Sequence, residues 1–280
     1  MSRKTKSRIE VTLIYLFIAF MFVIIAYPLL WTISMSFNPG TSLYSASLIP
    51  EKPSLEHYKW LFTSPQSDYL LWYKNSLFVA FANSILSVFF TALIAYAFSR
   101  YQFVGRKMGL YLFLVLQMFP SLMAMVALYI LLNMLGLLDS LWGLILIYVG
   151  GQIPFNAWLV KGYFDTIPRE LDEAARIDGA GHLAVFFRIM LPLAKPILAV
   201  VALFNFMAPF TDFLLPSIVL RDPEKYTLAV GLFNFISDRF ANNFTRFAAG
   251  SILIAAPIAI VFLFLQRYLI SGLTAGGTKG

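Results

Sequence analysis

Six long apolar runs dominate this chain and restrict what it can fold into. They cover approximately residues 11–37, 77–98, 108–135, 141–163, 191–220 and 247–269. Each is long enough to cross a bilayer as a helix, which takes about 20 residues. Charged residues make up only 12% of the chain, about half the share in soluble domains. The sequence therefore predicts an all-α polytopic membrane protein with six transmembrane helices, in one membrane domain over residues 11–270.

Proline interrupts five of these six runs. In a soluble helix an interior proline costs about 3 kcal/mol, but in a helix bundle neighbouring helices and water satisfy the freed carbonyls. Two explanations are open. Either the prolines kink the helices, to shape a cavity or to act as hinges, or they reflect the general abundance of proline in membrane helices. The residues concerned are Pro28, Pro120, Pro154, Pro209, Pro216 and Pro257.

The Lys and Arg residues between the runs predict an orientation. With the N-terminus inside the cell, the inner segments hold fourteen of these residues and the outer segments hold seven. Because segments rich in Lys and Arg stay in the cytoplasm, residues 1–10 and the tail 271–280 are both expected there, in a multi-pass protein of the cytoplasmic membrane. The basic residues flank the runs, so the bilayer and not nucleic acid is the expected partner of the +7 net charge. The first run is expected to remain as a signal anchor.

A carboxylate inside the fifth run, Asp212, is a candidate for a translocation pathway together with the nearby Asn205 and Thr211. A charged group at the bilayer centre costs about 2.5–3.5 kcal/mol on insertion scales and marks a cavity or pathway. Asp212 also lies close enough to the end of the run to reach the outer interface. Other amides in the runs can line the same route or bridge helices, namely Gln117, Asn133, Gln152 and Asn156.

Side chains for catalysis or metal binding are scarce. The chain has no cysteine, and His57 and His182 lie far apart in sequence, without the clustered donors of a metal site. The phosphate-binding pattern G-x-x-x-x-G-K-[ST] does not occur, and no nucleophile and base form a recognisable constellation. We expect no catalytic residue, no metal site and no cofactor bound by this chain.

A charged, helix-forming segment separates the fourth and fifth runs. Thr166 suits an N-cap and Pro168 suits a first turn. Gly179 and Gly181 are expected to end the helix, because glycine readily adopts the left-handed cap. Acidic residues follow the predicted start, where they favour the helix dipole, namely Glu170, Asp172 and Glu173. A second helical piece is expected over residues 182–190.

One face of this short helix suits a protein groove. Leu171, Ala174, Ala175 and Asp178 recur at helical spacing. The alanines are small enough to enter a groove, while Glu173 and Asp178 can pair with basic residues of a partner. A helix that lies on the membrane surface is rich in Lys and Arg opposite bulky apolar residues, so that alternative fits poorly.

The spacing of residues across this segment resembles the cytoplasmic "EAA" loop in the membrane subunits of ABC importers. It comprises Glu173-Ala174-Ala175, Asp178-Gly179-Ala180, Ile189, Leu191-Pro192 and Pro196. Nearly the full length resembles the smaller membrane subunit of maltose/maltodextrin importers. The supporting motifs are Gly105-Arg106, Gln117-Met118-Phe119-Pro120, Lys161-Gly162-Tyr163-Phe164, residues 226–231 (YTLAVG) and residues 272–277 (GLTAGG).

This resemblance implies a type I importer fold in a bacterial or archaeal membrane. The implied partners are a larger homologous permease subunit, an extracellular sugar-binding protein and two ATPase subunits, which bind the ATP and Mg. The loop 164–190 would dock on an ATPase through a coupling helix, and residues 222–243 would reach the binding protein. The implied coupling residues are Glu173, Ala174, Ala175, Asp178 and Gly179; the implied tail contacts are Thr274, Ala275, Gly276 and Gly277.

Other functions fit the sequence less well. A secondary, ion-coupled transporter usually carries internal repeats and intramembrane ionisable groups, and this chain shows one membrane carboxylate and no visible repeat. An intramembrane enzyme lacks its catalytic constellation. Within the importer family, maltose or maltodextrin is the expected substrate, and another di- or oligosaccharide, such as a galacto-oligosaccharide, is the alternative.

Overall fold

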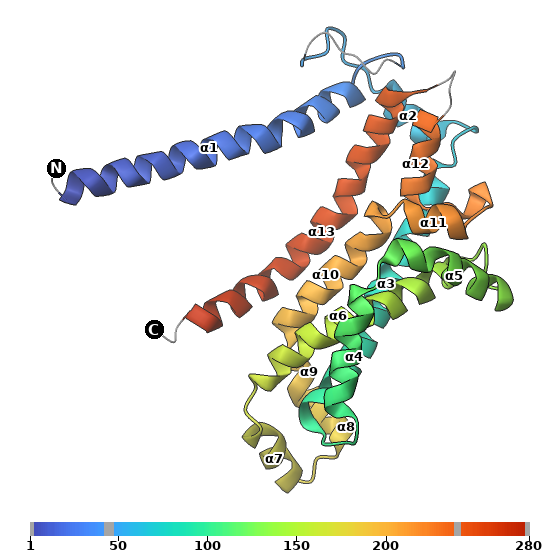
Figure 1. Ribbon diagram of the computed structural model, residues 1–280. Coiled ribbons are helices and arrows are strands. Elements are labelled where there is room, and N and C mark those ends of the chain that lie inside the picture. The colour runs from blue at the N-terminus through green and yellow to red at the C-terminus, as the bar shows by residue number, and fades with distance from the viewer. Residues whose placement is uncertain (1–2, 42–47, 238–241, 278–280) are drawn as a thin grey trace. The chain divides into compact units, whose positions relative to one another are not determined.

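All regular secondary structure in the described part of the chain is helical. The computed structural model describes residues 3–41, 48–237 and 242–277, and side chains within these ranges from residue 9 to residue 268. The helices are α1 (Arg3–Ser36), α2 (Glu56–Thr63), α3 (Tyr69–Arg100), α4 (Arg106–Met118), α5 (Ser121–Met134), α6 (Leu141–Asp165), α7 (Glu170–Ile177), α8 (His182–Val185), α9 (Leu191–Leu193), α10 (Lys195–Thr211), α11 (Leu214–Val219), α12 (Leu228–Ser237) and α13 (Phe244–Gly277) (Figure 1).

Four uninterrupted segments are long and apolar enough to cross a membrane. They are Ile9–Ser36, Tyr69–Arg100, Leu141–Asp165 and Phe244–Tyr268. Two bent pairs of helices also pass this test, so that the described chain contains up to six membrane crossings. This agrees with the six predicted spans in number, although two of the spans are not single helices.

The third predicted span, residues 108–135, is broken in its middle. Helices α4 and α5 meet at an angle of 100°, where the sequence predicted at most a kink at Pro120. The residue before a proline avoids the helical region, and Phe119 accordingly takes an extended conformation with ψ 126°. The chain leaves α4 there and begins α5 directly after Pro120.

The fifth predicted span, residues 191–220, is also wrong as one helix. The chain bends by 79° between Leu193 and Lys195, and α10 then ends at Thr211 with Asp212 extended at ψ 121°. Pro216 explains the second break, since its ring would clash with the carbonyl of residue 212 in a continuous helix. Residues 214–219 instead form the separate helix α11.

By its internal contacts the chain divides into two compact units. One comprises residues 1–69 and 232–253 and the other residues 70–231 and 254–280. Within the first unit, the Tyr69 hydroxyl donates to the Gly250 carbonyl at 2.9 Å. The Arg246 guanidinium also lies 3.5 Å from the centre of the Trp60 ring in that unit, a cation–π contact.

Buried amides join α3, α6 and α10 inside the second unit. The fully buried Asn83 on α3 donates to the Asn205 carbonyl on α10 at 2.7 Å and to the Gln152 side chain on α6 at 3.2 Å. Asn156 on α6 donates to the Asn205 side chain at 3.3 Å. Such hydrogen bonds hold membrane helices together, so these amides link α3, α6 and α10 within the second unit.

Candidate functional site: coupling helix and membrane cavity

The helix α7 ends as the sequence predicted. Gly179 has φ +87°, its N–H bonds the Arg176 carbonyl at 3.0 Å, and the N–H of Ala180 bonds the Ala175 carbonyl at 2.9 Å. This pair of bonds is the Schellman motif, which requires a left-handed residue. The predicted role of Gly181 is wrong, because its φ of −71° and ψ of 167° are extended, and it is the N-cap residue that precedes α8.

The predicted start of α7 is also wrong. Thr166 closes the preceding helix α6 and its hydroxyl bonds the Tyr163 carbonyl at 2.7 Å. The helix α7 begins four residues later at Glu170. Pro168 disfavours a helical conformation at the residue before it, and the short connector that results separates the two helices.

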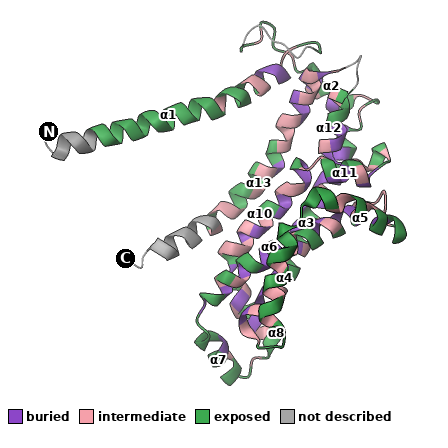
Figure 2. Cartoon of the chain, viewed as in Figure 1, coloured by how far each residue is buried: buried purple, intermediate pink, exposed green. Residues whose placement is uncertain are grey.

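One side of α7 is exposed (Figure 2) and carries both acidic and apolar residues. Glu173, Ala174 and Asp178 are exposed, and Ala175 is half-buried. Ile177 is 86% exposed, so this short helix presents a large apolar side chain to the solvent. This surface offers carboxylates and apolar area together, which suits a groove with basic edges on another protein.

The opposite side of α7 is held by an ion pair that sequence reasoning missed. The side chains of Arg100 and Asp172 are only 4% and 7% exposed, and the Arg100 Nε lies 2.5 Å from Asp172 Oδ2. The spacing of Asp172 and Ala175 on one helical face could have indicated an inward-facing carboxylate. Its partner lies at the far end of another predicted span, so no local pattern could identify it.

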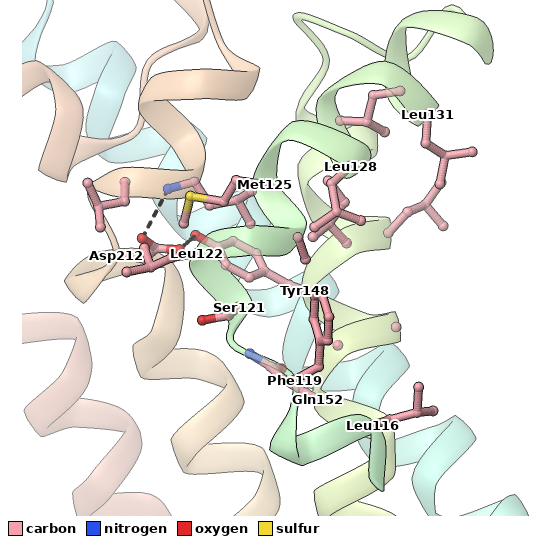
Figure 3. A pocket seen from close by; sticks show the side chains of 18 of the residues that line it. Leu116, Phe119, Ser121, Leu122, Met125, Leu128, Leu131, Tyr148, Gln152 and Asp212 are labelled. Carbon is pink, nitrogen blue, oxygen red and sulfur yellow. Dashed lines mark hydrogen bonds between the residues drawn. The ribbon is translucent and has the colours of Figure 1, made fainter. Parts of the chain in front are cut away.

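A cavity of about 1000 Å³ lies beside the breaks at Phe119–Pro120 and at Asp212 (Figure 3). Its walls come from α4, α5, α6 and the start of α11 and are mostly apolar. The predicted pathway residue Asp212 lies in this wall and accepts a hydrogen bond from the Tyr148 hydroxyl at 2.9 Å. The other polar side chains of the lining are Gln117, Ser121 and Gln152.

The structure separates the other two predicted pathway residues from Asp212. Asn205 is 2% exposed, belongs to the amide network, and donates to the Val201 carbonyl at 2.6 Å. The exposed Thr211 hydroxyl bonds back to the Ala208 carbonyl at 3.2 Å. Among the described residues, neither of these two lines the cavity.

At the other end of α3 and α6, the segment between α11 and α12 is held by hydrogen bonds to its backbone. Trp72 Nε1 donates to the Pro223 carbonyl at 2.9 Å, and Asn75 donates to the Glu224 carbonyl at 2.8 Å. The N–H of Leu228 donates to the Ser76 hydroxyl at 2.7 Å. The predicted contact region 222–243 begins in this segment, and its residues 238–241 lie outside the described chain.

The predicted tail contacts fall in the last helix. Helix α13 continues to Gly277, beyond the predicted end of the sixth span at residue 269. The backbone of Thr274, Ala275, Gly276 and Gly277 is therefore helical, and their side chains lie outside the described part of the chain.

Comparison with known proteins identifies the family. The model of the family described as "binding-protein-dependent transport system inner membrane component" matches residues 87–274. The galactooligosaccharides transport system permease protein GanQ of Bacillus subtilis (strain 168) is 53% identical, over 99% of this chain and 98% of the relative. The maltodextrin transport system permease protein MdxG of the same strain is 51% identical, over 95% of both proteins.

More distant similarities agree with this result. The maltose/maltodextrin transport system permease protein MalG of Escherichia coli (strain K12) is 40% identical, over 99% of this chain and 98% of the relative. A chain in the crystal structure of a bacterial ABC transporter that imports the acidic polysaccharide alginate superposes with a TM-score of 0.79 at 25% identity, over 96% of this chain and 98% of that one. The chain therefore belongs to the family of binding-protein-dependent transport system inner membrane components, as a sugar-permease subunit with the type I ABC importer fold.

Proposed function

We propose that this chain forms one half of the membrane pore of an ATP-driven oligosaccharide importer. A larger homologous permease forms the other half, two ATPase subunits bind ATP and Mg, and an extracellular binding protein delivers the sugar. The exposed acidic and apolar face of α7, ended by the left-handed Gly179, is the observation that carries this proposal. It is the surface on which an ATPase would dock.

The orientation follows from the charge distribution. Both termini and α7 lie in the cytoplasm, on the side richer in Lys and Arg, where ATP is available to the partner subunits. The tail Thr274–Gly277 then reaches toward the ATPases. The segment that follows α11 faces the outside, where the binding protein arrives, and Asp222 at its start belongs to that contact region.

The cavity beside Asp212 is part of the sugar pathway. Tyr148, Gln152 and Asp212 offer hydroxyl, amide and carboxylate groups to an uncharged sugar on an otherwise apolar wall, the general composition of small-molecule sites. The breaks at Phe119–Pro120 and at Asp212 support this assignment, since non-helical backbone at membrane depth is tolerated where it lines a cavity.

The sugar is a maltodextrin or another neutral oligosaccharide. Relatives named for galactooligosaccharides and for maltodextrin are 53% and 51% identical to this chain, so identity does not separate the two substrates. Uptake by the reconstituted complex, measured with each sugar and its own binding protein, distinguishes them. A galacto-oligosaccharide is the second candidate because of the 53% identical relative.

The charge reversal Glu173→Lys tests the coupling role of α7. We expect the ATPase subunits to be lost during co-purification, because a hydrogen bond to a charged group contributes about 1.5–3 kcal/mol. Glu10→Lys makes the same change in charge at an exposed residue of α1 and should retain the complex. If Glu173→Lys keeps both the ATPase subunits and wild-type uptake, α7 is not the coupling element.

Two further measurements separate this function from its alternatives. The purified chain alone should hydrolyse no ATP, and activity should appear only in the full complex. Uptake should stop when ATP is depleted and should survive collapse of the ion gradient. The reverse pattern would indicate a secondary transporter.

A further inference from the structure

Arg100 connects three helices at the α7 end of the second unit. It is the last residue of α3. Its Nη1 donates to the Phe164 carbonyl in the last turn of α6 at 3.1 Å, and its Nη2 donates to the Ile167 carbonyl in the connector after α6 at 2.9 Å. Its Nε forms an ion pair with Asp172 on α7, without hydrogen-bond geometry. The planar, forked guanidinium can make these contacts at once, which the single ammonium of lysine cannot.

Neighbouring groups reinforce the joint between α3 and α6. The buried Ser99 hydroxyl donates to Asp165 Oδ1 at 2.7 Å. Arg169, in the connector before α7, donates to the Ser99 carbonyl at 3.2 Å. Cations that bond the last carbonyls of a helix are favourable there, so the ends of α3 and α6 and the start of α7 form one connected cluster.

The buried ion pair of Arg100 and Asp172 is poorly explained by its contribution to the stability of the fold. Removing two charges from water costs about as much as their attraction returns, and apolar replacements of buried pairs are often neutral or stabilising. The second oxygen of Asp172, Oδ1, is buried without a hydrogen-bond partner among the described residues, which adds to the cost. A fixed orientation of α7 accounts better for the pair.

The geometry of α7 makes this orientation consequential. Asp172 directly precedes the exposed Glu173, so the inward and outward faces of an eight-residue helix are set together. We propose that Arg100 is a positioning residue, which holds α7 to the ends of α3 and α6 so that a force on the exposed face of α7 moves both membrane helices. This inference rests on the proposed coupling function.

The test uses the full complex in proteoliposomes with its ATPase subunits and binding protein. Asp172→Asn keeps the shape of the side chain and removes its charge, and Arg100→Lys keeps the charge and removes the fork. Lys107→Gln is the control, because it removes a cation at an exposed residue of α4, outside this cluster. Retained ATPase subunits, ATP hydrolysis and sugar uptake are measured for each variant.

For both test variants we expect ATPase subunits to be retained and the sugar moved per ATP to fall at least about fivefold, the lower range of coupling effects. The control should behave as wild type. The proposal is overturned if Arg100→Lys moves as much sugar per ATP as wild type. It is also overturned if the variants lose thermal stability while their coupling stays normal. Should Asp172→Asn fail to assemble, Arg100→Lys decides alone. Failure of the coupling function itself would appear separately, as a Glu173→Lys complex that remains intact and active.

Discussion

The carboxylate of Asp139 lies 2.8 Å from the ammonium of Lys225 and closes the segment that follows α11 onto the start of α6. Its other oxygen accepts hydrogen bonds from the N–H groups of Arg221 at 2.9 Å and of Asp222 at 3.1 Å. Asp139 itself has φ +55°, a conformation that aspartate tolerates better than most residues. One side chain thus shapes the base of the region that we assign to the binding protein.

This contact predicts a pH dependence of the segment. Partial burial raises the pKa of Asp139, but the Lys225 ammonium and the two N–H groups outweigh burial and leave the pKa lowered. The hydrogen bond to Asp139 raises the pKa of Lys225. The lowered pKa means that Asp139 stabilises the folded segment above its unfolded pKa of about 3.9, and this stabilisation is lost as the pH falls through its folded pKa. The raised pKa of Lys225 has the opposite effect. Lys225 stabilises the segment below its unfolded pKa of about 10.4, and this stabilisation is lost as the pH rises through its folded pKa.

Hydrogen exchange of residues 221–226, corrected for intrinsic rates, checks this dependence. We expect protection to hold at neutral pH and to fall as the pH drops below about 4, the unfolded pKa of aspartate, and on through the lowered folded pKa of Asp139. Asp139→Asn should lower protection several-fold at neutral pH, and Asp68→Asn, an exposed control, should not. Equal protection in wild type and Asp139→Asn would show that Trp72 and Asn75 hold the segment without the ion pair.

Replacing Asp212 by leucine should lower sugar uptake and leave membrane insertion intact. The change removes a carboxylate from the cavity wall together with its hydrogen bonds to Tyr148 and to the N–H of Leu215. Asp212→Asn keeps an amide in its place and should lose less activity. Uptake by reconstituted vesicles at matched expression is the measurement. Normal uptake by Asp212→Leu would place this residue outside the pathway.

Substitutions that add a side chain at Gly179 should uncouple sugar transport from ATP hydrolysis by straining the backbone. A left-handed conformation costs an ordinary residue about 1–2 kcal/mol, and a Cβ at Gly179 would meet open space among the described residues, so strain and not collision is the cause. Gly179→Ala and Gly179→Asp should both lower uptake per ATP. Gly181→Ala is the matched control, since Gly181 is extended and equally open. Similar effects at the two positions would contradict the role of the left-handed turn.

A methyl group at Gly231 should destabilise the second unit by collision. A Cβ there would lie 2.2 Å from two carbon atoms of the Trp72 ring, and the hydrogen bond to Pro223 holds this ring in place. Overpacking of this kind costs about 1–3 kcal/mol. Thermal unfolding in detergent should show a lower midpoint for Gly231→Ala. Gly150→Ala, at an open position on α6, should show no loss.

The predictable features are those determined by nearby residues. Apolar length revealed the spans, and the left-handed turn at Gly179 followed from the end of a short helical pattern, because both depend on consecutive residues. The start of α7 was misplaced because Thr166, a good N-cap residue, ends α6 instead, and α7 begins after Arg169 without a side-chain cap. In the structure both the backbone N–H and the hydroxyl of Thr166 bond the Tyr163 carbonyl, which assigns Thr166 to the end of α6.

The features that escaped prediction depend on distant residues or on competing local effects. The pair of Arg100 and Asp172 joins different helices, and no spacing rule relates them. Asn205 and Asp212 are both polar and lie on one predicted span, yet one is enclosed by α3 and α6 and the other faces the cavity. Proline also had different outcomes, since Pro154 stays inside α6 while Pro216 accompanies a break.

The ending of α10 at Thr211 has a consequence for the surrounding lipid. Its 17 residues extend about 25 Å at 1.5 Å per residue, less than the hydrocarbon thickness of about 30 Å. A crossing helix that is too short makes the bilayer thin locally, at a cost of a fraction of a kcal/mol per Å. The acyl-chain length of the membrane is therefore expected to act at the Asp212 break, the same place where we propose that the sugar passes, because thicker lipid would draw this break further from the headgroups.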